Sequence, residues 1–485
     1  MAPTDVRARE LPRNYWIAGL LGAYACIVAA SPSAMAAAAW SAPLVTIPLL
    51  LWTLQTPCRW LWCFFFAALL LPPLPFALGN SGPHVGVALA GLGLVCGAAR
   101  LREWRPKLDL LAFVLVVFLL LLLCSSALAV FYSGLEVAAG SLMRVLLFGI
   151  SVYVFFYCAY GPGVSAREEG FGGARRLYWF GLFSALFACI DFYYQFPAPA
   201  GYGPQFIWLD SGVYRRAQGF FYEASTLGNL CAFFLIMIAV RLLRGRAEQR
   251  SPISRLALCF GAPILFATLV LSYSRASLLN LFVALSALLY LERARIRIVR
   301  LFAIAASCVA AGSLAAWRLF PEATWNYWLR LTHSQFFFTQ TESVLSGRLA
   351  SWHAIAAFLG ANPWHMILGI GYKTLPYSNF AGRTIIADNM YLSLLVETGI
   401  VGLAVFFLLN FAILRAAWRA ARRQDSRSSF FGTWIFCFWI GQLFQMLSGD
   451  LLTYWRVLPV YFWVLAMAVQ RPTHDSGSEV LQDFE

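Results

Sequence analysis

Charged side chains are scarce in this sequence. Only 12% of its 485 residues are Asp, Glu, Lys or Arg, against about 25% in an average soluble domain, and 61% are hydrophobic. No soluble core can bury so large an apolar excess. Apolar runs of about 16 to 25 residues recur along the chain, and each is long enough to cross the hydrocarbon core of a bilayer. These features predict an integral membrane protein.

Cysteine patterns typical of metal sites and disulfide frameworks are also lacking. None of the 11 cysteines forms a Cys-x-x-Cys pair, and they lie within or beside apolar runs. The first apolar run lacks a small-residue cleavage site followed by a soluble domain, so we expect it to be a retained span. The inverted internal repeat of many secondary transporters is not evident either. We therefore expect no bound metal and no cofactor.

The apolar runs predict an all-α polytopic membrane protein with about 12 to 14 transmembrane helices. This predicts transmembrane helices within 1–319, an extracytoplasmic loop at 320–388, transmembrane helices within 389–470 and a tail at 471–485. The candidate spans are 15–30, 34–54, 60–79, 84–99, 110–131, 143–160, 177–195, 224–243, 257–273, 276–291, 299–319, 389–414, 430–448 and 453–470.

The net charge of +14 has a distribution that predicts topology. Lys and Arg cluster in alternate connections, whereas a nucleic-acid-binding protein gathers them on one helix or patch. The positive-inside rule places these clusters and both termini in the cytoplasm. Three segments then face outward: 196–223, the tight turn at Arg275 and the long loop 320–388. Within that loop, Leu349, Trp352, Ile355, Ala356 and Leu359 have helical spacing, which predicts an interfacial amphipathic helix over 346–359.

Arginines are prominent at the outward ends of the predicted spans. Arg215 and Arg216 precede a span in the stretch from Tyr214 to Glu223, and Arg275 occupies a turn too short to leave the membrane surface. A guanidinium stays charged and can bind two phosphate oxygens at once, so two or three convergent arginines would suit a diphosphate. The alternative is that each simply extends to the lipid head groups.

The long outward segment adds further motifs. They are Ser346-Gly-Arg348 ahead of Trp352, Gly369-Ile-Gly371, Asp388-Asn389-Met-Tyr391-Leu392 and Glu397-Thr-Gly399-Ile-Val-Gly402. The Gly-x-Gly follows no predicted strand and opens no dinucleotide fold, which argues against a nucleotide site. Glu397, in the outer part of a span, needs a partner, for which an arginine is a candidate, and Asp450 is expected to pair with Arg456.

The order of these motifs resembles the O-antigen ligase and O-antigen/exopolysaccharide polymerase superfamily, over about 215–405. Members are bacterial inner-membrane glycosyltransferases of the all-helical, GT-C-like type. They use undecaprenyl-diphosphate-linked oligosaccharides as donors and a glycan as acceptor, without metal or nucleotide, and a chain-length regulator is a further partner to consider. The resemblance implies that Arg216 (or Arg215), Arg275 and Arg348 bind the diphosphate.

One departure from the family pattern concerns the catalytic base. Ligases tend to have His before the Asn, where this chain has Asp388. A carboxylate can also accept the proton of an attacking sugar hydroxyl, so we expect Asp388 to be the base, with His353 as the alternative. The departure favours a polymerase over a ligase, and a transporter of lipid-linked sugars or a membrane scaffold are the non-enzyme alternatives. The further substrate-binding candidates are Glu223, Trp352, His353, Asn389, Tyr391 and Glu397.

Overall fold

The computed structural model describes residues 19, 22–31, 33–74, 83–161, 166–199, 202–209, 212–244, 253–293, 314, 317–318, 321–333 and 348–470. Contacts divide the chain into two compact units, 1–60 and 61–485, and every site discussed below lies in the second. Most of the span predicted at 299–319 and the whole tail 471–485 lie outside the described residues. Of the span predicted at 15–30, residues 22–29 are described as helical.

The described elements are almost all helices. The first unit holds α2 (Ala34–Gln55), and α3 (Arg59–Leu70) crosses the boundary between the units. The second unit holds α4 (Val85–Ala98), α5 (Leu110–Ser133), α6 (Leu135–Tyr160), α7 (Ala166–Tyr194), β1 (Phe206–Leu209), β2 (Gly212–Arg215), α8 (Ala224–Arg244), α9 (Arg255–Leu271), α10 (Arg275–Leu291), α12 (Pro321–His333), α14 (Arg348–Ala361), α15 (His365–Leu368), α16 (Met390–Ala421), α17 (Ser426–Gln445) and α18 (Leu458–Val469).

Six of the described helices are long and apolar enough to cross a membrane: α5, α6, α7, α8, α16 and α17. Five shorter helices are also apolar, namely α3, α4, α9, α10 and α18. This confirms the all-α polytopic membrane fold predicted from hydropathy. The exception is a two-stranded antiparallel hairpin, β1 with β2, in which Phe206 pairs with Arg215. The sequence did not predict it, because four-residue strands are too short to show a clear alternation.

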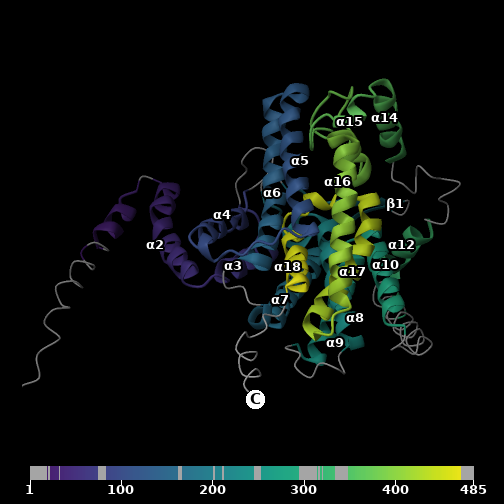
Figure 1. Cartoon of the computed structure of the whole chain (residues 1–485). Helices are drawn as coiled ribbons and strands as arrows, with labels where there is room; N and C mark the ends of the chain where they lie inside the picture. Colours follow the sequence, from purple (N-terminus) through teal and green to yellow (C-terminus); the bar gives the residue numbers. More distant parts are fainter. Residues whose placement is uncertain are drawn as a thin grey trace, which may run out of the picture. The chain divides into compact units, whose positions relative to one another are not determined.

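Helix α17 is the centre of the second unit (Figure 1). It packs against α8, α10, α16 and α18, while α5 lies between α6 and α16. Both α8 and α17 are largely buried, whereas α5, α6 and α16 keep one apolar face exposed. An apolar helix surface left uncovered by protein is what a lipid-facing helix presents.

Side-chain caps explain where several helices begin. Asp109 accepts from the Ala112 N–H at the start of α5, and Asp425 does the same for Ser428 in α17. Ser274 caps α10 by accepting from the Ser277 N–H, at 3.3 Å. Such caps satisfy backbone donors that the first helical turn leaves unpaired.

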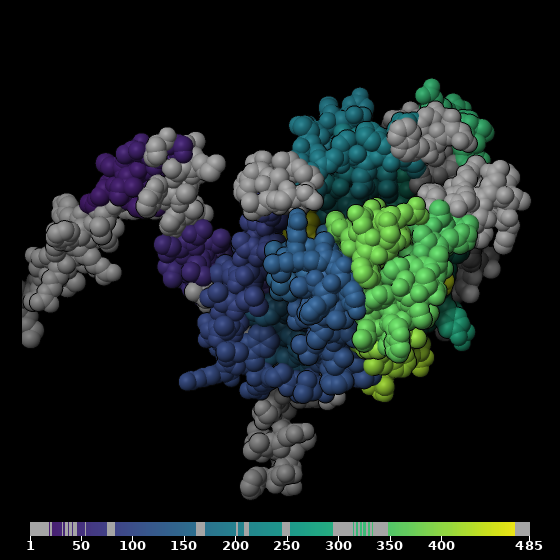
Figure 2. Space-filling model, turned by 90° about the horizontal axis from the view of Figure 1, so that it is seen from above, coloured from purple at the N-terminus to yellow at the C-terminus, as the bar shows by residue number. Residues whose placement is uncertain are grey.

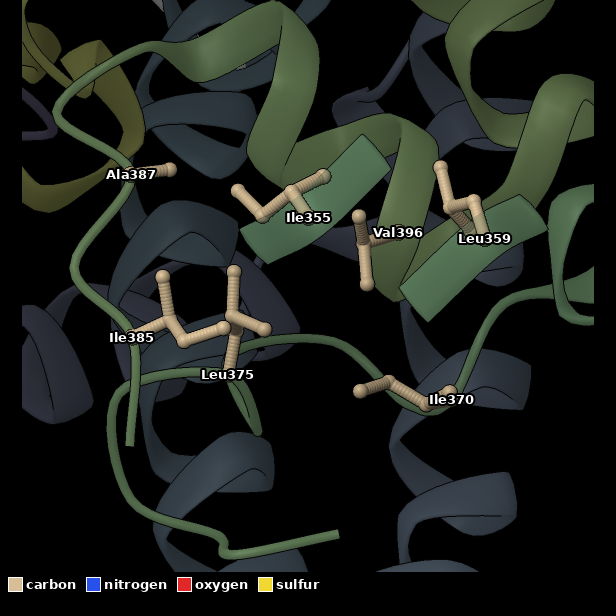
Figure 3. Close-up of a cluster of buried hydrophobic side chains, with 7 residues drawn as sticks. All are labelled: Ile355, Leu359, Ile370, Leu375, Ile385, Ala387 and Val396. Carbon is tan, nitrogen blue, oxygen red and sulfur yellow. The ribbon is translucent and has the colours of Figure 1, made fainter. Parts of the chain in front are cut away.

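In the long segment predicted to be extracytoplasmic, the structure describes residues 321–333 and 348–388, which hold the helices α12, α14 and α15. Helix α14 lies at the position predicted for the amphipathic helix, and its place at the membrane surface stays a prediction. Ile355 and Leu359 are buried against protein. Together with Ile370, Leu375, Ile385, Ala387 and Val396 they form a hydrophobic cluster between α14, the irregular stretch 369–389 and α16 (Figure 3).

A break inside α16 explains the glycines of two motifs. Gly399 has φ of +71°, so the helix is interrupted there, and Ile367 approaches so closely that a β-carbon would lie 2.0 Å from its carbonyl oxygen. Residues 367–371 pack against this break, and Gly371 donates its N–H to the Glu397 carbonyl at 3.0 Å. Ser125 on α5 donates to the same carbonyl. Seen from above, the green segment that includes α16 lies beside the blue segment that includes α5 (Figure 2).

Candidate active site

Arg216 lies between the β1–β2 hairpin and α8. Gly219, three residues later, has φ of +52°, and a β-carbon there would lie 2.8 Å from that of Ala188 on α7. Phe220 stacks on Phe187 with a centroid distance of 3.8 Å. Gly219 and the ring of Phe220 therefore pack the loop tightly against α7, which fixes the position of Arg216.

The loop is also tied to the turn between α9 and α10. Arg216 donates from Nε to the Ser272 carbonyl at 2.9 Å, and the Ala217 N–H donates to the Leu271 carbonyl at 2.9 Å. Burial lowers the pKa of the Arg216 guanidinium, and the positive charge of Arg348 lowers it further, against the opposing effects of Tyr454 and Glu223. Arg216 is therefore a partly buried cation with a second arginine nearby.

Arg275 is the first residue of α10, directly after the turn 272–274. Helix α8 approaches this turn closely because Gly228 has no side chain: a β-carbon there would lie 2.8 Å from the Ser272 Oγ and 2.9 Å from the Ser277 Oγ. The tight turn that the hydropathy pattern predicted at Arg275 is thus present, between α9 and α10. Arg275 interacts electrostatically with Arg348.

Arg348, the first residue of α14, connects the other groups. Its Nε donates to a carboxylate oxygen of Asp388 at 3.2 Å, and its Nη1 donates to the Ser448 hydroxyl at 2.8 Å. Its charge acts on both Arg216 and Arg275. The structure therefore brings together three arginines that are 59 and 73 residues apart in sequence (275 − 216 and 348 − 275), from three separate elements.

Asp388 stands at the end of the irregular stretch, just before α16. Its side chain is 48% exposed, and its backbone has φ of +46°, a conformation that costs energy in a non-glycine residue and is common at functional sites. Trp352 donates its indole N–H to the Ala387 carbonyl at 2.8 Å, and Asn389 caps α16 through the N–H groups of Tyr391 and Leu392. Neighbours on both sides thus hold Asp388 in place.

Glu223 lies beside Arg216 at the start of α8. Thr226 donates to its carboxylate at 2.7 Å. Burial raises the pKa of Glu223 and Asp450 raises it further, while Thr226 and Arg216 lower it; the net direction is upward. Glu223 therefore takes up its proton at a higher pH than an ordinary glutamate does.

This raised pKa gives a pH prediction for Glu223→Gln. Above the pKa the wild-type carboxylate opposes an anionic ligand at Arg216, so the variant should have a KM for an anionic donor about three to ten times lower. As pH falls through the pKa, wild-type Glu223 becomes neutral and the two KM values should converge. Steady-state kinetics across pH measures this. A variant without activity at any pH would show instead that the carboxylate takes part in the reaction.

A buried ion pair near this cluster was missed in the sequence. Lys373 pairs with Asp450, with side-chain exposures of 8% and 19%. Burial alone would lower the pKa of Lys373, but Asp450 and Glu397 raise it above its ordinary value. The Glu397 carboxylate also accepts from the Leu375 N–H at 3.3 Å. The positive charge of Lys373 is thus balanced by the protein's own carboxylates. The ion pair with Asp450 joins the irregular stretch 369–389 to the turn before α18.

The Lys373–Asp450 pair should contribute to stability. Lys373→Met alone leaves a buried carboxylate without its partner, a change that costs about 3–5 kcal/mol in other proteins. We expect a clear fall in Tm of the purified protein in detergent, and a smaller one for the double variant Lys373→Met/Asp450→Leu, which leaves no unpaired charge. Equal Tm values for the single variant and the wild type would contradict this account of the pair.

Several predicted site residues have other partners. Arg215 pairs with Asp191 on α7 at 3.4 Å, whereas Arg216 lies within the electrostatic influence of Arg348. Tyr391 donates its hydroxyl to the Leu443 carbonyl at 2.9 Å, and His353 is exposed on α14.

Two predicted pairings were wrong. Asp450 pairs with Lys373, whereas Arg456 donates to the backbone carbonyls of Ala68, Leu71 and Phe220. Glu397 has Lys373 as its cationic neighbour instead of an arginine. Both errors arose because the lysine was not considered as a partner.

Fold and site together define a class of protein. It is a helical, multi-span integral membrane protein with a cluster of arginines and carboxylates where three chain segments meet at the ends of its helices. Among the described residues, no group of three or more His, Cys, Asp or Glu side chains is arranged to hold a metal ion.

Comparison with known families defines it further. Residues 260–407 match the sequence model of a family described as O-antigen ligase, a segment that contains Arg275, Arg348 and Asp388 but not Arg216. The match covers less than half of the chain and supports a similarity of this segment to the O-antigen ligases and polymerases, a superfamily of membrane glycosyltransferases that act on lipid-linked glycans and glycan acceptors. No curated protein matches the chain.

Proposed function

We propose that this protein is a polymerase of a bacterial cell-surface polysaccharide, which transfers glycan from undecaprenyl diphosphate to a sugar hydroxyl. The observation that carries the proposal is the meeting of Arg216, Arg275 and Arg348, with Asp388 bonded to the last of them. Several guanidinium groups at one place match the charge and the oxygen atoms of a diphosphate. The distribution of Lys and Arg along the chain supports an inner-membrane location with this site on the extracytoplasmic side.

The reaction is a direct displacement at the anomeric carbon of the donor sugar. The acceptor hydroxyl attacks this carbon, its proton passes to the Asp388 carboxylate, and the bond from the anomeric carbon to the diphosphate oxygen breaks. Negative charge grows on the leaving undecaprenyl diphosphate, so the arginines stabilise the transition state more than the bound donor. Because one displacement occurs, the configuration at the anomeric carbon is inverted. The arginines supply the positive charge, and we expect activity to persist with a metal chelator.

Asp388 is suited to the role of base by position. It is half exposed, so an incoming hydroxyl can reach it, and Arg348 orients it. The same residue favours polymerase over ligase, because ligases of this superfamily tend to have histidine there. The description of the matched family favours the second candidate, a ligase that moves finished glycan to lipid A-core or another acceptor.

The lipid-linked glycans of a deletion strain separate the two candidates. Loss of polymer with accumulation of single repeat units on the lipid carrier is expected for a polymerase. Polymer that still forms but never reaches its final acceptor would assign the protein as a ligase. Unchanged amounts of polymer and of lipid-linked intermediates would contradict both.

A further inference from the structure

Four buried amide side chains lie within the helix bundle. They are Asn229 on α8, Asn280 on α10, and Gln442 and Gln445 on α17, and each is at most 2% exposed. The Asn229 Nδ2 donates to both glutamine Oε1 atoms, at 2.6 and 2.7 Å, and the Asn280 Nδ2 donates to the same two oxygens, at 3.1 and 2.9 Å. We call these four residues the amide cluster.

The amide cluster is linked to the site by further hydrogen bonds. Gln445 donates from Nε2 to the Ser277 hydroxyl at 3.2 Å, and Ser277 bonds to the cap Ser274 at 2.8 Å. Tyr454, a neighbour of Arg216, forms side-chain hydrogen bonds with Gln445 and Ser225. Hydrogen bonds therefore run from the amide cluster to the residues beside Arg216 and Arg275.

The amide cluster joins α8, α10 and α17, and the position of each arginine depends on one of these helices. Arg275 begins α10, five residues before Asn280, which is about 7 Å along a helix. Ser448, the hydrogen-bond partner of Arg348, follows Gln445 by three residues. Arg216 precedes α8, which contributes Asn229. The packing of α10 on α17 is close here, because a β-carbon on Gly441 would lie 2.3 Å from Asn280 oxygens.

We infer that the amide cluster positions the three arginines for a diphosphate, an inference that rests on the proposed function. A polar side chain buried in an apolar bundle is costly unless paired, so these bonds hold α8, α10 and α17 at defined separations. Two polar atoms of the cluster, Asn280 Oδ1 and Gln442 Nε2, have no hydrogen-bond partner among the described residues. An apolar core of similar shape would avoid this cost, so stability alone does not explain the four amides.

The test replaces the amide cluster with apolar side chains of similar size. The fourfold variant is Asn229→Leu/Asn280→Leu/Gln442→Met/Gln445→Met, and Gln442→Met alone is the milder variant. The matched control is Asn410→Leu, because Asn410 on α16 is also a buried amide and accepts from Trp439 on α17 at 2.9 Å. Purified proteins are compared for Tm, for glycan transfer per folded molecule, and for inhibition by farnesyl diphosphate and farnesyl monophosphate.

A displacement of about 1 Å in catalytic groups costs about 100-fold in rate. We therefore expect kcat/KM to fall about 100-fold in the fourfold variant and about tenfold in Gln442→Met. In both, the preference for farnesyl diphosphate over the monophosphate should fall, while the control keeps it. A purely structural role would lower the yield of folded protein without changing this preference.

The outcomes separate the inference from the proposed function. If the wild type and the control transfer glycan, and Gln442→Met keeps full activity and full diphosphate preference, the positioning role is wrong. This variant decides the question even if the fourfold variant does not fold. If the wild type transfers no glycan from the lipid diphosphate, the proposed function itself fails.

Discussion

Replacing Arg275 with alanine should lower glycan transfer about 100- to 1,000-fold. This is the loss commonly seen when one group that stabilises developing negative charge is removed from an enzyme. Arg275 begins α10 beside the tied turn 272–274 and shares an electrostatic environment with Arg348, so its position is defined. Arg275→Lys should keep part of the activity, because lysine retains the charge but not the planar pair of donors. Transfer is measured with lipid-linked donor and acceptor at equal amounts of folded protein.

The matched control for Arg275→Ala is Arg383→Ala. Arg383 is exposed and lies in the same folded segment as Asp388. We expect the control to keep wild-type activity, which excludes a general effect of removing one positive charge. Wild-type kinetics in Arg275→Ala would show that the arginine cluster does not bind the leaving group, and the mechanism would have to be abandoned.

Asp388→Asn should reduce kcat about 100- to 10,000-fold, which is the usual contribution of a general base. The amide keeps the size of the side chain and an oxygen that can accept from Arg348, so binding of the donor should change little. The effect should therefore appear in kcat and leave KM nearly unchanged.

His353→Ala is the companion variant for Asp388→Asn. His353 is exposed on α14, and we expect its removal to leave activity near the wild-type level. The reverse result, a fully active Asp388→Asn and an inactive His353→Ala, would assign the base to the histidine.

The membrane fold was predictable because it depends on local composition. Runs of apolar residues predicted every described helix of the bundle, since a span must be apolar throughout its length. The break of α16 at Gly399 was not predicted, because the motif Glu-x-Gly-x-x-Gly is compatible with a continuous helix as well as with an interrupted one. Its cause is tertiary: Ile367 packs where a side chain on residue 399 would lie.

The site was predictable only where motifs contain its residues. Arg275, Arg348 and Asp388 stand in recognisable stretches, although their meeting depends on packing between distant elements. Lys373 was missed because nothing in its surroundings indicates burial, and its partner Asp450 is 77 residues away. The choice between Arg215 and Arg216 needed the structure too, because adjacent residues in an extended chain point in opposite directions. The outward orientation of the site and the cytoplasmic termini stay predictions from the distribution of Lys and Arg.

The most direct test of the central claim follows the lipid carrier and the new bond together. Purified protein in proteoliposomes receives a polyprenyl-diphosphate-linked oligosaccharide and an acceptor glycan, in the presence of a chelator. We expect one free polyprenyl diphosphate for each new glycosidic bond, with inverted configuration at the anomeric carbon, and almost none of either with Arg275→Ala. Lipid-linked oligosaccharide that crosses the bilayer intact, with no diphosphate released and no bond formed, would show a transporter and contradict the account.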